Sequence, residues 1–228
     1  MPDMERNTFQ VGTFEVNCSI VSENGKALVV DPGAEATRIR AELKKRELSP
    51  AAILLTHAHF DHVCAVPELQ RAFPGLPVFV GGRDMKLLTH PLNQFLPDYL
   101  GVKNVDNVTT LGGDGSLEPA AVLQAFVDSL GWTSRVEVIE TPGHTPGGVC
   151  YLFSPAQGVS PEVPGTLLSG DTLFCGSVGR TDFPGGSMPT LQASLEKLKV
   201  LPGETVVVPG HGAETTIARE VASNPFLQ

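Results

Sequence analysis

Apolar residues occur along the chain in short runs separated by polar turns, a pattern that predicts alternating strands and helices. The first third contains three such runs, and we expect strands at residues 8–11, 15–21 and 27–30. A helix is expected over residues 34–46, because Ala36, Ile39 and Leu43 recur at helical spacing while charged residues occupy the remaining positions. Residues 51–55 form a brief apolar run that is typical of a buried strand.

The rest of the chain continues this alternation. Further strands are expected at residues 78–80, 136–139, 149–153, 167–168 and 206–208, and helices at residues 66–72, 117–130, 189–198 and 215–222. The segment 84–134 is the least regular, and we expect it to form part of the wall of a substrate site. Strands at both ends with helices between them favour an α/β (α+β) fold in which two sheets are faced by helices. We expect residues 1–228 to form one domain.

Composition places the chain among ordinary folded proteins, since 41% of its 228 residues are hydrophobic and 18% are charged. A formal net charge of −9 speaks against a nucleic-acid-binding protein, which needs a basic surface. A small anionic substrate is compatible with this charge, because bound divalent cations make their surroundings positive. The chain has neither a secretory signal nor the ~20 apolar residues of a membrane span, so we expect a cytoplasmic protein. The oligomeric state is not indicated.

The four cysteines, Cys18, Cys64, Cys150 and Cys175, are far apart and include no C-x-x-C pair. This pattern is typical of reduced, mostly buried thiols in a cytosolic enzyme. We therefore expect neither disulfides nor a cysteine-based zinc site.

Five of the six histidines fall in three short clusters. His57, His59, Asp61 and His62 lie within six positions, directly after the strand expected at 51–55. A single histidine such as His90 is more often a hydrogen-bonded core residue than a ligand. Three imidazoles and a carboxylate packed at the edge of a core, however, are costly to desolvate unless they bind a cation. The remaining candidate ligands are His144, Asp171 and His211, each flanked by glycine.

The spacing of these residues predicts two metal ions. Residues i and i+2 of an extended segment project to the same side, so His57 and His59 can bind one ion, while Asp61 and His62 face a second. We therefore expect one site of His57, His59 and His144, a second of Asp61, His62 and His211, and Asp171 as a bridge between them. Nitrogen and oxygen ligands suit two divalent ions, with Zn²⁺ expected and iron or manganese also compatible. Two ions about 3.5–4 Å apart lower the pKa of a shared water towards ~7 and supply a hydroxide nucleophile.

The motif Thr56-His57-Ala58-His59-Phe60-Asp61-His62, followed by single His, Asp and His ligands, resembles that of the metallo-β-lactamase superfamily. The resemblance runs from the strand around Cys18, through Val30-Asp31-Pro32-Gly33, to the C-terminus. Within the superfamily, residues 170–174, 179–182 and 209–212 resemble the short bacterial members of the glyoxalase II group, the hydroxyacylglutathione hydrolases. The resemblance implies a four-layer αββα sandwich with the metals at one edge. It also implies hydrolysis of a small-molecule thioester such as S-lactoylglutathione to a hydroxy acid and a free thiol.

Two departures from the glyoxalase II pattern concern the recognition of glutathione. Longer members carry a C-terminal helical extension that holds the glutathione carboxylate, and the chain ends at Gln228 without one. Arg180 stands at the position of a family lysine, and Asp182 at that of a tyrosine. Arg180 is therefore a candidate substrate-binding residue, because a guanidinium binds a carboxylate through two hydrogen bonds. The alternative, an ion pair with Asp182, is equally compatible with the sequence.

The expected reaction is metal-assisted hydrolysis, with Asp61 as a catalytic residue that steers the hydroxide and accepts its proton. A mononuclear-iron persulfide dioxygenase is the main alternative, because such enzymes also show a Gly-Arg-Thr-Asp stretch and use two histidines and one aspartate. Hydrolysis of another ester, a lactone or a β-lactam would use the same residues. A non-catalytic metal-binding protein is disfavoured, since no ligand of the family set is missing.

Overall fold

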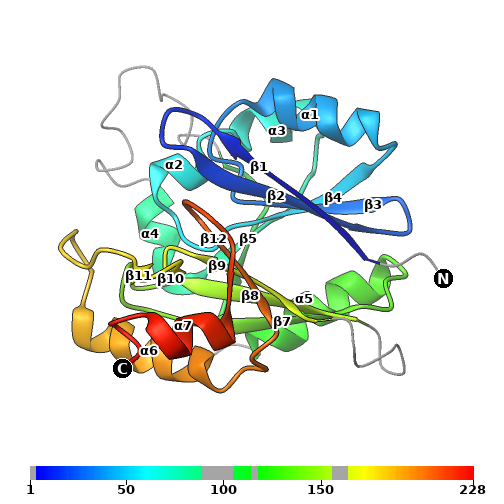
Figure 1. Cartoon of the computed structure of the whole chain (residues 1–228). Coiled ribbons are helices and arrows are strands. Elements are labelled where there is room, and N and C mark those ends of the chain that lie inside the picture. Colours follow the sequence, from blue (N-terminus) through cyan, green and yellow to red (C-terminus); the bar gives the residue numbers. More distant parts are fainter. Residues whose placement is uncertain (1–3, 89–104, 114–117, 156–163) are drawn as a thin grey trace.

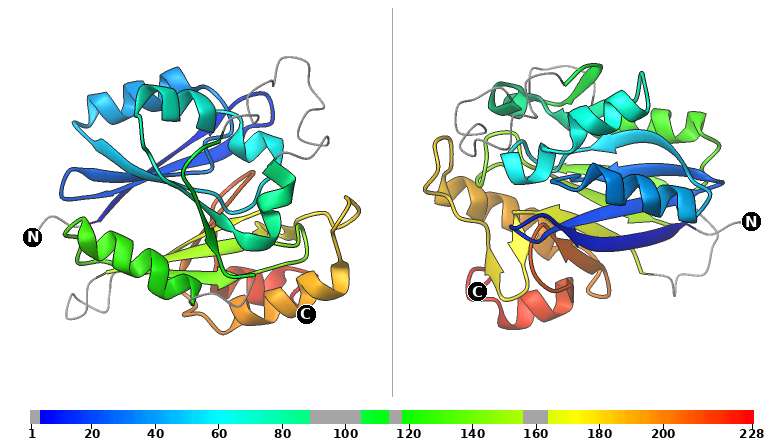
Figure 2. Two further views of the ribbon diagram at one scale, coloured as in Figure 1. Left: turned by 180° about the vertical axis from the view of Figure 1, so that it is seen from behind. Right: turned by 90° about the horizontal axis from the view of Figure 1, so that it is seen from above.

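The computed structural model describes residues 4–88, 105–113, 118–155 and 164–228. Two β-sheets pack face to face and carry helices on their outer faces, which gives the four-layer αββα sandwich that was predicted (Figure 1). The first sheet has the strand order β1-β2-β3-β4-β5-β6 and the second β13-β12-β9-β8-β7, while β10 and β11 form a separate pair. Helices α1 and α3 cover the outer face of the first sheet, and α6 and α7 that of the second (Figures 1 and 2).

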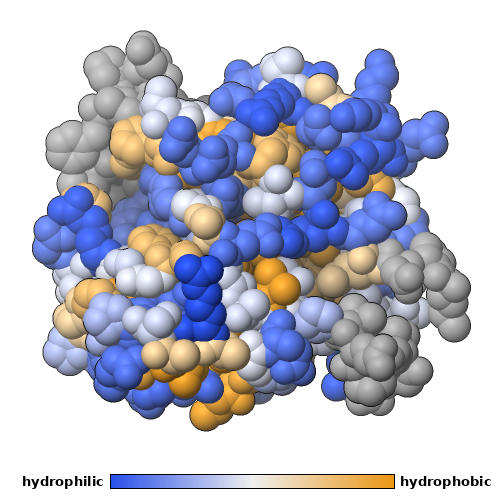
Figure 3. Space-filling view, in the orientation of Figure 1, coloured by the Kyte–Doolittle hydropathy of each residue, from blue (hydrophilic) through white to orange (hydrophobic). Residues whose placement is uncertain are grey.

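The first sheet contains the N-terminal strands in an antiparallel arrangement and continues with parallel strands. Its members are β1 (Glu5–Val11), β2 (Val16–Glu23), β3 (Lys26–Val30), β4 (Ser49–Leu54), β5 (Val78–Gly81) and β6 (Val108–Leu111). Alternate residues face opposite layers: Ile20 and Ile53 pack under helices α1 (Ala36–Lys45) and α3 (Val66–Ala72), whereas Val21 and Leu54 face the second sheet. The outer surface around α1 is largely hydrophilic (Figure 3), as its predicted amphipathic pattern requires.

The second sheet follows the same rule of alternation. It consists of β7 (Arg135–Glu140), β8 (Val149–Ser154), β9 (Thr166–Gly170), β12 (Val206–Pro209) and β13 (Thr215–Thr216), with only β9 and β12 parallel. Tyr151 and Phe153 point into the core between the sheets, while Cys150 and Leu152 pack against α6 (Met188–Lys199) and α7 (Ile217–Ser223). Helix α5 (Pro119–Ser129) contributes Leu123 to the central core.

Most predicted elements are present with shifted ends, and the differences have physical reasons. The expected helix over residues 215–222 begins with the short strand β13, because Thr215 pairs with β12 before α7 starts. The segment 84–134 contains two elements of the sandwich itself, the unpredicted strand β6 and the predicted helix α5, and its place in the wall of a substrate site stays a prediction. Besides β6 and β13, five short elements of the described residues were not predicted: α2 (Phe60–Val63), η1 (Gly82–Asp84), α4 (Met85–Leu88), β10 (Leu173–Phe174) and β11 (Ser177–Val178). His90 lies outside the described residues.

The carboxyl ends of several strands meet at one edge of the sandwich. The loop after β4 carries His57, the loop between β7 and β8 carries His144, Asp171 follows β9, and His211 follows β12. Because these strands belong to two sheets packed face to face, the loops that follow them converge at this edge of the sandwich. Among the described residues, no helix is long and apolar enough to cross a membrane.

Candidate metal centre

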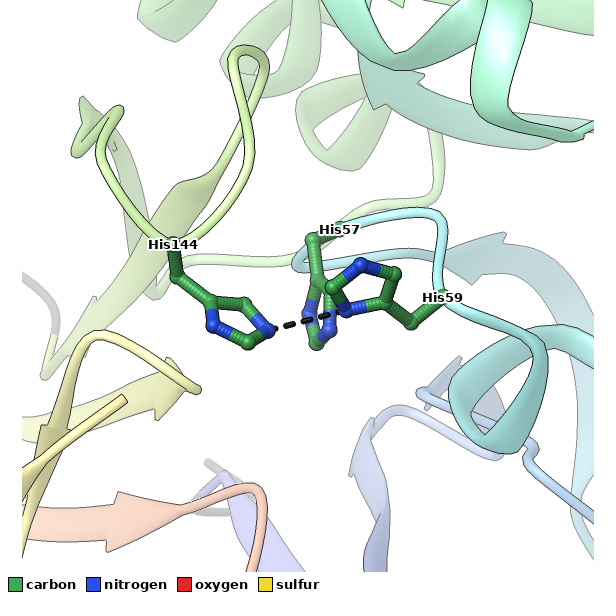
Figure 4. A group of neighbouring side chains, drawn as sticks. All are labelled: His57, His59 and His144. Carbon is green, nitrogen blue, oxygen red and sulfur yellow. Dashed lines mark hydrogen bonds between the residues drawn. The ribbon is translucent and has the colours of Figure 1, made fainter. Parts of the chain in front are cut away.

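The structure brings all seven predicted ligands together. One group is formed by His57, His59 and His144 (Figure 4) and another by Asp61, His62 and His211, as the sequence predicted. In each group, one ligand atom from every side chain lies within 4.8 Å of the others. We call these groups the first and the second triad. Residues more than 80 positions apart in the chain therefore meet in one place: Nδ1 of His59 lies 2.9 Å from Nε2 of His144.

Asp171 lies between the two triads. Its Oδ1 is 3.4 Å from Nε2 of His62, and its Oδ2 is 3.5 Å from Nε2 of His144 and 3.7 Å from Nε2 of His211. The carboxylate thus faces members of both triads, which is the position expected of a bridging ligand. Oδ2 approaches a histidine of each triad, so the two oxygens do not each face a single triad.

Four of the five histidines have Nδ1 engaged by an oxygen, which leaves Nε2 directed towards the centre. The pairs are His57 with the Thr56 hydroxyl (3.1 Å), His62 with Asp31 (3.0 Å), His144 with the Arg180 carbonyl (2.7 Å) and His211 with the Phe14 carbonyl (2.9 Å). Such hydrogen bonds fix the ring orientation and the tautomer of metal-binding histidines. His59 differs, because its Nδ1 is the atom that faces the neighbouring ligand His144.

The hydrogen bonds around Thr56 determine which nitrogen of His57 carries the proton. This shows whether the centre can accommodate cations. The Thr56 hydroxyl donates to Asp31 at 2.6 Å, so it accepts from Nδ1–H of His57 and leaves a bare lone pair on Nε2. Among the described residues, Nε2 of His57, Nε2 of His62 and Oδ1 of Asp171 are buried without a hydrogen-bond partner. Buried polar atoms without a partner are costly unless a cation occupies the space that they face. The residues therefore fit divalent metal ions of the type that bind nitrogen and oxygen ligands.

The electrostatics of the centre also suit metal binding. Burial lowers the pKa of His57 well below its usual range and that of His59 to about 4, so both rings are neutral ligands at pH 7. Although burial opposes it, the neighbouring His62 and His144 lower the pKa of Asp171, which is therefore ionised. Burial likewise opposes protonation of His62, but the carboxylates of Asp31 and Asp171 raise its pKa well above the usual value. A cation bound at His62 therefore has to displace a proton from it.

Glycine allows the chain to approach the ligands closely. A Cβ atom at Gly210 would collide with the carboxylate of Asp171 and would lie 2.7 Å from Cε1 of His62. Gly170 adopts φ +49°, and a Cβ there would collide with the Thr56 side chain. Close packing around the candidate ligands therefore requires glycine at positions 170 and 210.

Three residues that support the ligands were not predicted from the sequence. Asp31 accepts hydrogen bonds from the Thr56 backbone N–H (2.8 Å), from its hydroxyl and from His62. Asn17 donates to the carbonyls of Pro209 and Gly212, both at 2.9 Å, and so holds the loop of His211. The third is Asp84, a fully buried carboxylate after β5. For Asp31, the only available signal was an aspartate directly after an apolar strand, which is also the signature of an ordinary turn.

The ion pair between Arg180 and Asp182, one of the two predicted alternatives, is present. The guanidinium donates to both oxygens of Asp182, at 2.6 and 2.7 Å, and its Cζ lies 4.0 Å above the ring of Phe183. The hydrogen bonds from Arg180 lower the pKa of Asp182 to about 2. Both charged groups are exposed, and the Phe183 ring lies 5.7 Å from that of His59. A substrate contact by Arg180 stays a prediction, whereas its carbonyl contributes to the centre by accepting from His144.

Known proteins resemble this chain over nearly its whole length. Residues 11–211 match the family model of the metallo-beta-lactamase superfamily. An uncharacterized protein of Mycobacterium leprae is 38% identical (96% of this chain, 97% of that protein). The probable metallo-hydrolase YqgX of Bacillus subtilis is 34% identical over 98% of both chains. The hydroxyacylglutathione hydrolase GloC of Haemophilus influenzae is 33% identical over 95% of both.

Two solved structures show the same similarity in three dimensions. The BLEG-1 B3 metallo-beta-lactamase superposes with a TM-score of 0.73 at 33% identity, over 98% of this chain and 99% of its own. TTHA1623 in a di-iron-bound form gives a TM-score of 0.73 at 34% identity, over 97% and 100% respectively. The fold, the convergent histidine and aspartate side chains and these similarities lead to one conclusion: the chain belongs to the metallo-β-lactamase superfamily.

Proposed function

We propose that this protein is a binuclear metal-dependent hydrolase of thioesters, with a hydroxyacyl thioester such as S-lactoylglutathione as its substrate. The observation that carries the proposal is the pair of complete triads with Asp171 between them. The similarity to a hydroxyacylglutathione hydrolase over 95% of both chains supports the choice of substrate class.

Each triad and Asp171 would hold one of two divalent ions. When bound, the ions would lower the pKa of a water molecule and polarise the carbonyl oxygen of the substrate. Zinc is our choice for the first triad because it consists of three imidazoles. The second triad includes a carboxylate, and iron or manganese also accepts such a set of ligands. The similar TTHA1623 structure is a di-iron-bound form.

Asp61 is the residue that we propose to orient the attacking water. Its Oδ2 lies 3.3 Å from Nε2 of His211 and 3.9 Å from Nε2 of His62, at the inner side of the second triad. Burial opposes ionisation of Asp61, yet His62 and His211 lower its pKa, so the carboxylate is charged and accepts a hydrogen bond from water. Its low basicity limits it to a partial share in proton removal.

The overall reaction needs no nucleophilic side chain. The oxygen of water forms a bond to the acyl carbon, the C–S bond breaks, and the two protons end on the buffer or on the released thiolate. A thiol with a pKa of about 8.5 is a competent leaving group without a strong general acid. This agrees with the cysteines of the chain: burial raises the pKa of Cys64 to about 12, so its thiol is not a nucleophile.

A second candidate, β-lactam hydrolysis, is favoured by the similarity to the BLEG-1 structure. It breaks a C–N bond instead of a C–S bond by the same attack of water on a carbonyl carbon. A poorer leaving group places a greater demand on proton donation than a thiolate does. The second triad weighs against a mononuclear-iron dioxygenase, since such an enzyme does not need His211.

The test compares four measurements on one purified sample. These are its metal content, thiol release from S-lactoylglutathione, hydrolysis of a chromogenic cephalosporin, and oxygen uptake with glutathione persulfide. We expect two ions per chain and thiol release that is lost in Asp171→Ala together with metal content. Full thiol release by Asp171→Ala would refute the proposal, as would oxygen uptake or cephalosporin hydrolysis without thiol release.

A further inference from the structure

A single buried carboxylate joins the two loops that supply the first triad. Oδ1 of Asp84 accepts from the backbone N–H of Gly147 at 2.6 Å. Its Oδ2 accepts from the hydroxyl of Thr145 at 2.8 Å and from the backbone N–H of Ala58 at 3.1 Å. Ala58 stands between the ligands His57 and His59, and Thr145 directly follows the ligand His144. Asp84 itself belongs to neither loop, because it ends the short helix η1 (Gly82–Asp84) after β5.

The packing around Asp84 leaves little room for another arrangement. Its side chain is completely buried, and a Cβ atom at Gly147 would collide with its backbone nitrogen and lie within 3 Å of its carboxylate. A Cβ at Gly81 would collide in turn with the carbonyl of Gly147. The end of β5 and the loop after His144 are thus in direct contact through glycines, and the carboxylate fills the space between them.

The second triad is held by a separate set of hydrogen bonds. Asp31 binds His62, the Phe14 carbonyl binds His211, and Asn17 holds the loop of His211. Among the hydrogen bonds of the described residues, Asp84 makes none to this set. A perturbation at Asp84 therefore acts first on the positions of His57, His59 and His144.

We propose that Asp84 is a positioning residue that sets the spacing of the first triad and thereby its affinity for metal. This inference rests on the proposed binuclear centre. Among the described residues, the hydrogen bonds of Asp84 go to Ala58, Thr145 and Gly147 and to no candidate ligand atom, so it acts through the loops on both sides of the triad. Hydrogen-bond partners of this kind typically change metal affinity by about 10–100-fold when they are removed.

Replacement of Asp84 by asparagine keeps nearly the same side-chain shape and reduces the number of hydrogen-bond acceptors. The carboxylate offers two acceptor oxygens, whereas the amide offers one oxygen and an NH₂ group. In either orientation the NH₂ group faces a backbone N–H, that of Ala58 or that of Gly147, and this N–H loses its acceptor. Because the side chain of Asp84 is completely buried, solvent cannot compensate for the loss of an acceptor.

The experiment is a titration of metal-free Asp84→Asn with Zn²⁺, in competition with a chromophoric chelator, alongside wild type. Glu23→Gln is the matched control, because Glu23 is also buried and accepts hydrogen bonds from two backbone N–H groups, those of Thr133 and Ser134, far from the centre. We expect the Kd of one of two sites to rise by about 10–100-fold in Asp84→Asn and neither to change in Glu23→Gln. Anomalous scattering from crystals of the variant grown at limiting Zn²⁺ should show the remaining ion at the second triad.

A pair of substitutions at Thr145 separates hydrogen bonding from packing. Thr145→Ser keeps the hydroxyl that donates to Asp84 and should retain the wild-type affinity, whereas Thr145→Val should weaken the first site. Wild-type affinity at both sites in Asp84→Asn would overturn the proposal, and so would an equal loss in Glu23→Gln or a loss confined to the second triad. If wild type binds a single ion at the first triad, the binuclear function fails while the effect of Asp84→Asn on that ion still decides the inference. Absence of any ion at the first triad of wild type overturns both.

Discussion

Replacement of Asp31 by asparagine should destabilise the protein strongly, even without metal. Asp31 is buried, and its carboxylate accepts three hydrogen bonds: from the Thr56 N–H (2.8 Å), the Thr56 hydroxyl (2.6 Å) and Nδ1 of His62 (3.0 Å). Its backbone has φ +49°, a conformation that asparagine adopts as readily as aspartate. Asp31→Asn therefore changes charge and acceptor number without straining the main chain.

The magnitude follows from these three contacts. If the amide oxygen keeps the bonds to the Thr56 hydroxyl and His62, the NH₂ group faces the Thr56 N–H, and a buried donor without acceptor costs about 1–3 kcal/mol. The two remaining bonds lose their ionic character, which removes about 1 kcal/mol each. The free energy of unfolding should fall by roughly 3–5 kcal/mol, a large part of the ~5–15 kcal/mol of a typical domain. For a chain of this size, the Tm should drop by roughly 6–20 °C.

Urea unfolding and thermal unfolding of the metal-free protein measure this loss, because chelation removes the contribution of bound metal. Asp128→Asn is the control: Asp128 is an exposed residue of α5 that accepts one hydrogen bond, from Gln124 at 2.7 Å, and its substitution should change stability by less than about 0.5 kcal/mol. An Asp31→Asn variant as stable as that control would show that the network around Thr56 and His62 does not hold the centre in place.

Three further predictions follow from single contacts. Gly210→Ala should abolish metal binding at the second triad, since the added methyl group collides with Asp171 and His62; elemental analysis showing two tightly bound ions would contradict this. Burial opposes ionisation of Glu23, but hydrogen bonds from Ser134 and Thr133 lower its pKa below the ordinary 4.5, so it stabilises the fold fully above pH 4.5. The difference in the free energy of unfolding between wild type and Glu23→Gln should then shrink as the pH falls through that lowered pKa. Urea unfolding at several acid pH values measures this difference, and a difference that stays constant would contradict the prediction. If Arg180 contacts a substrate carboxylate, Arg180→Ala should raise KM for S-lactoylglutathione with little change in kcat, and Asp182→Asn, which frees the guanidinium, should lower KM; unchanged KM in both variants would assign Arg180 to its ion pair alone.

The apolar runs predicted the layers of the sandwich well, because buried strands and amphipathic helices follow regular periods. They missed β6, whose residues Val108 to Leu111 include two threonines and little hydrophobic contrast. They also missed β13, because two residues that pair with β12 are indistinguishable in sequence from the first turn of α7. Short elements of this kind depend on their partners in the fold more than on their own residues.

The candidate metal ligands could be recognised in the sequence for a different reason. His57, His59 and His62 are too costly to bury together without a cation, so their clustering is informative on its own. The supporting carboxylates Asp31 and Asp84 carry no comparable signal, since each resembles a turn residue until the fold shows which loops it joins. The choice between an ion pair and a substrate contact at Arg180 likewise depends on side-chain geometry that spacing along the chain does not determine.

The most direct test of the proposed binuclear centre is the anomalous scattering of metal ions in crystals of the active protein. We expect two peaks, one enclosed by His57, His59 and His144 and the other by Asp61, His62 and His211, with the Asp171 carboxylate in contact with both. A single peak, or none, in crystals of protein that releases thiol at its full rate would contradict it.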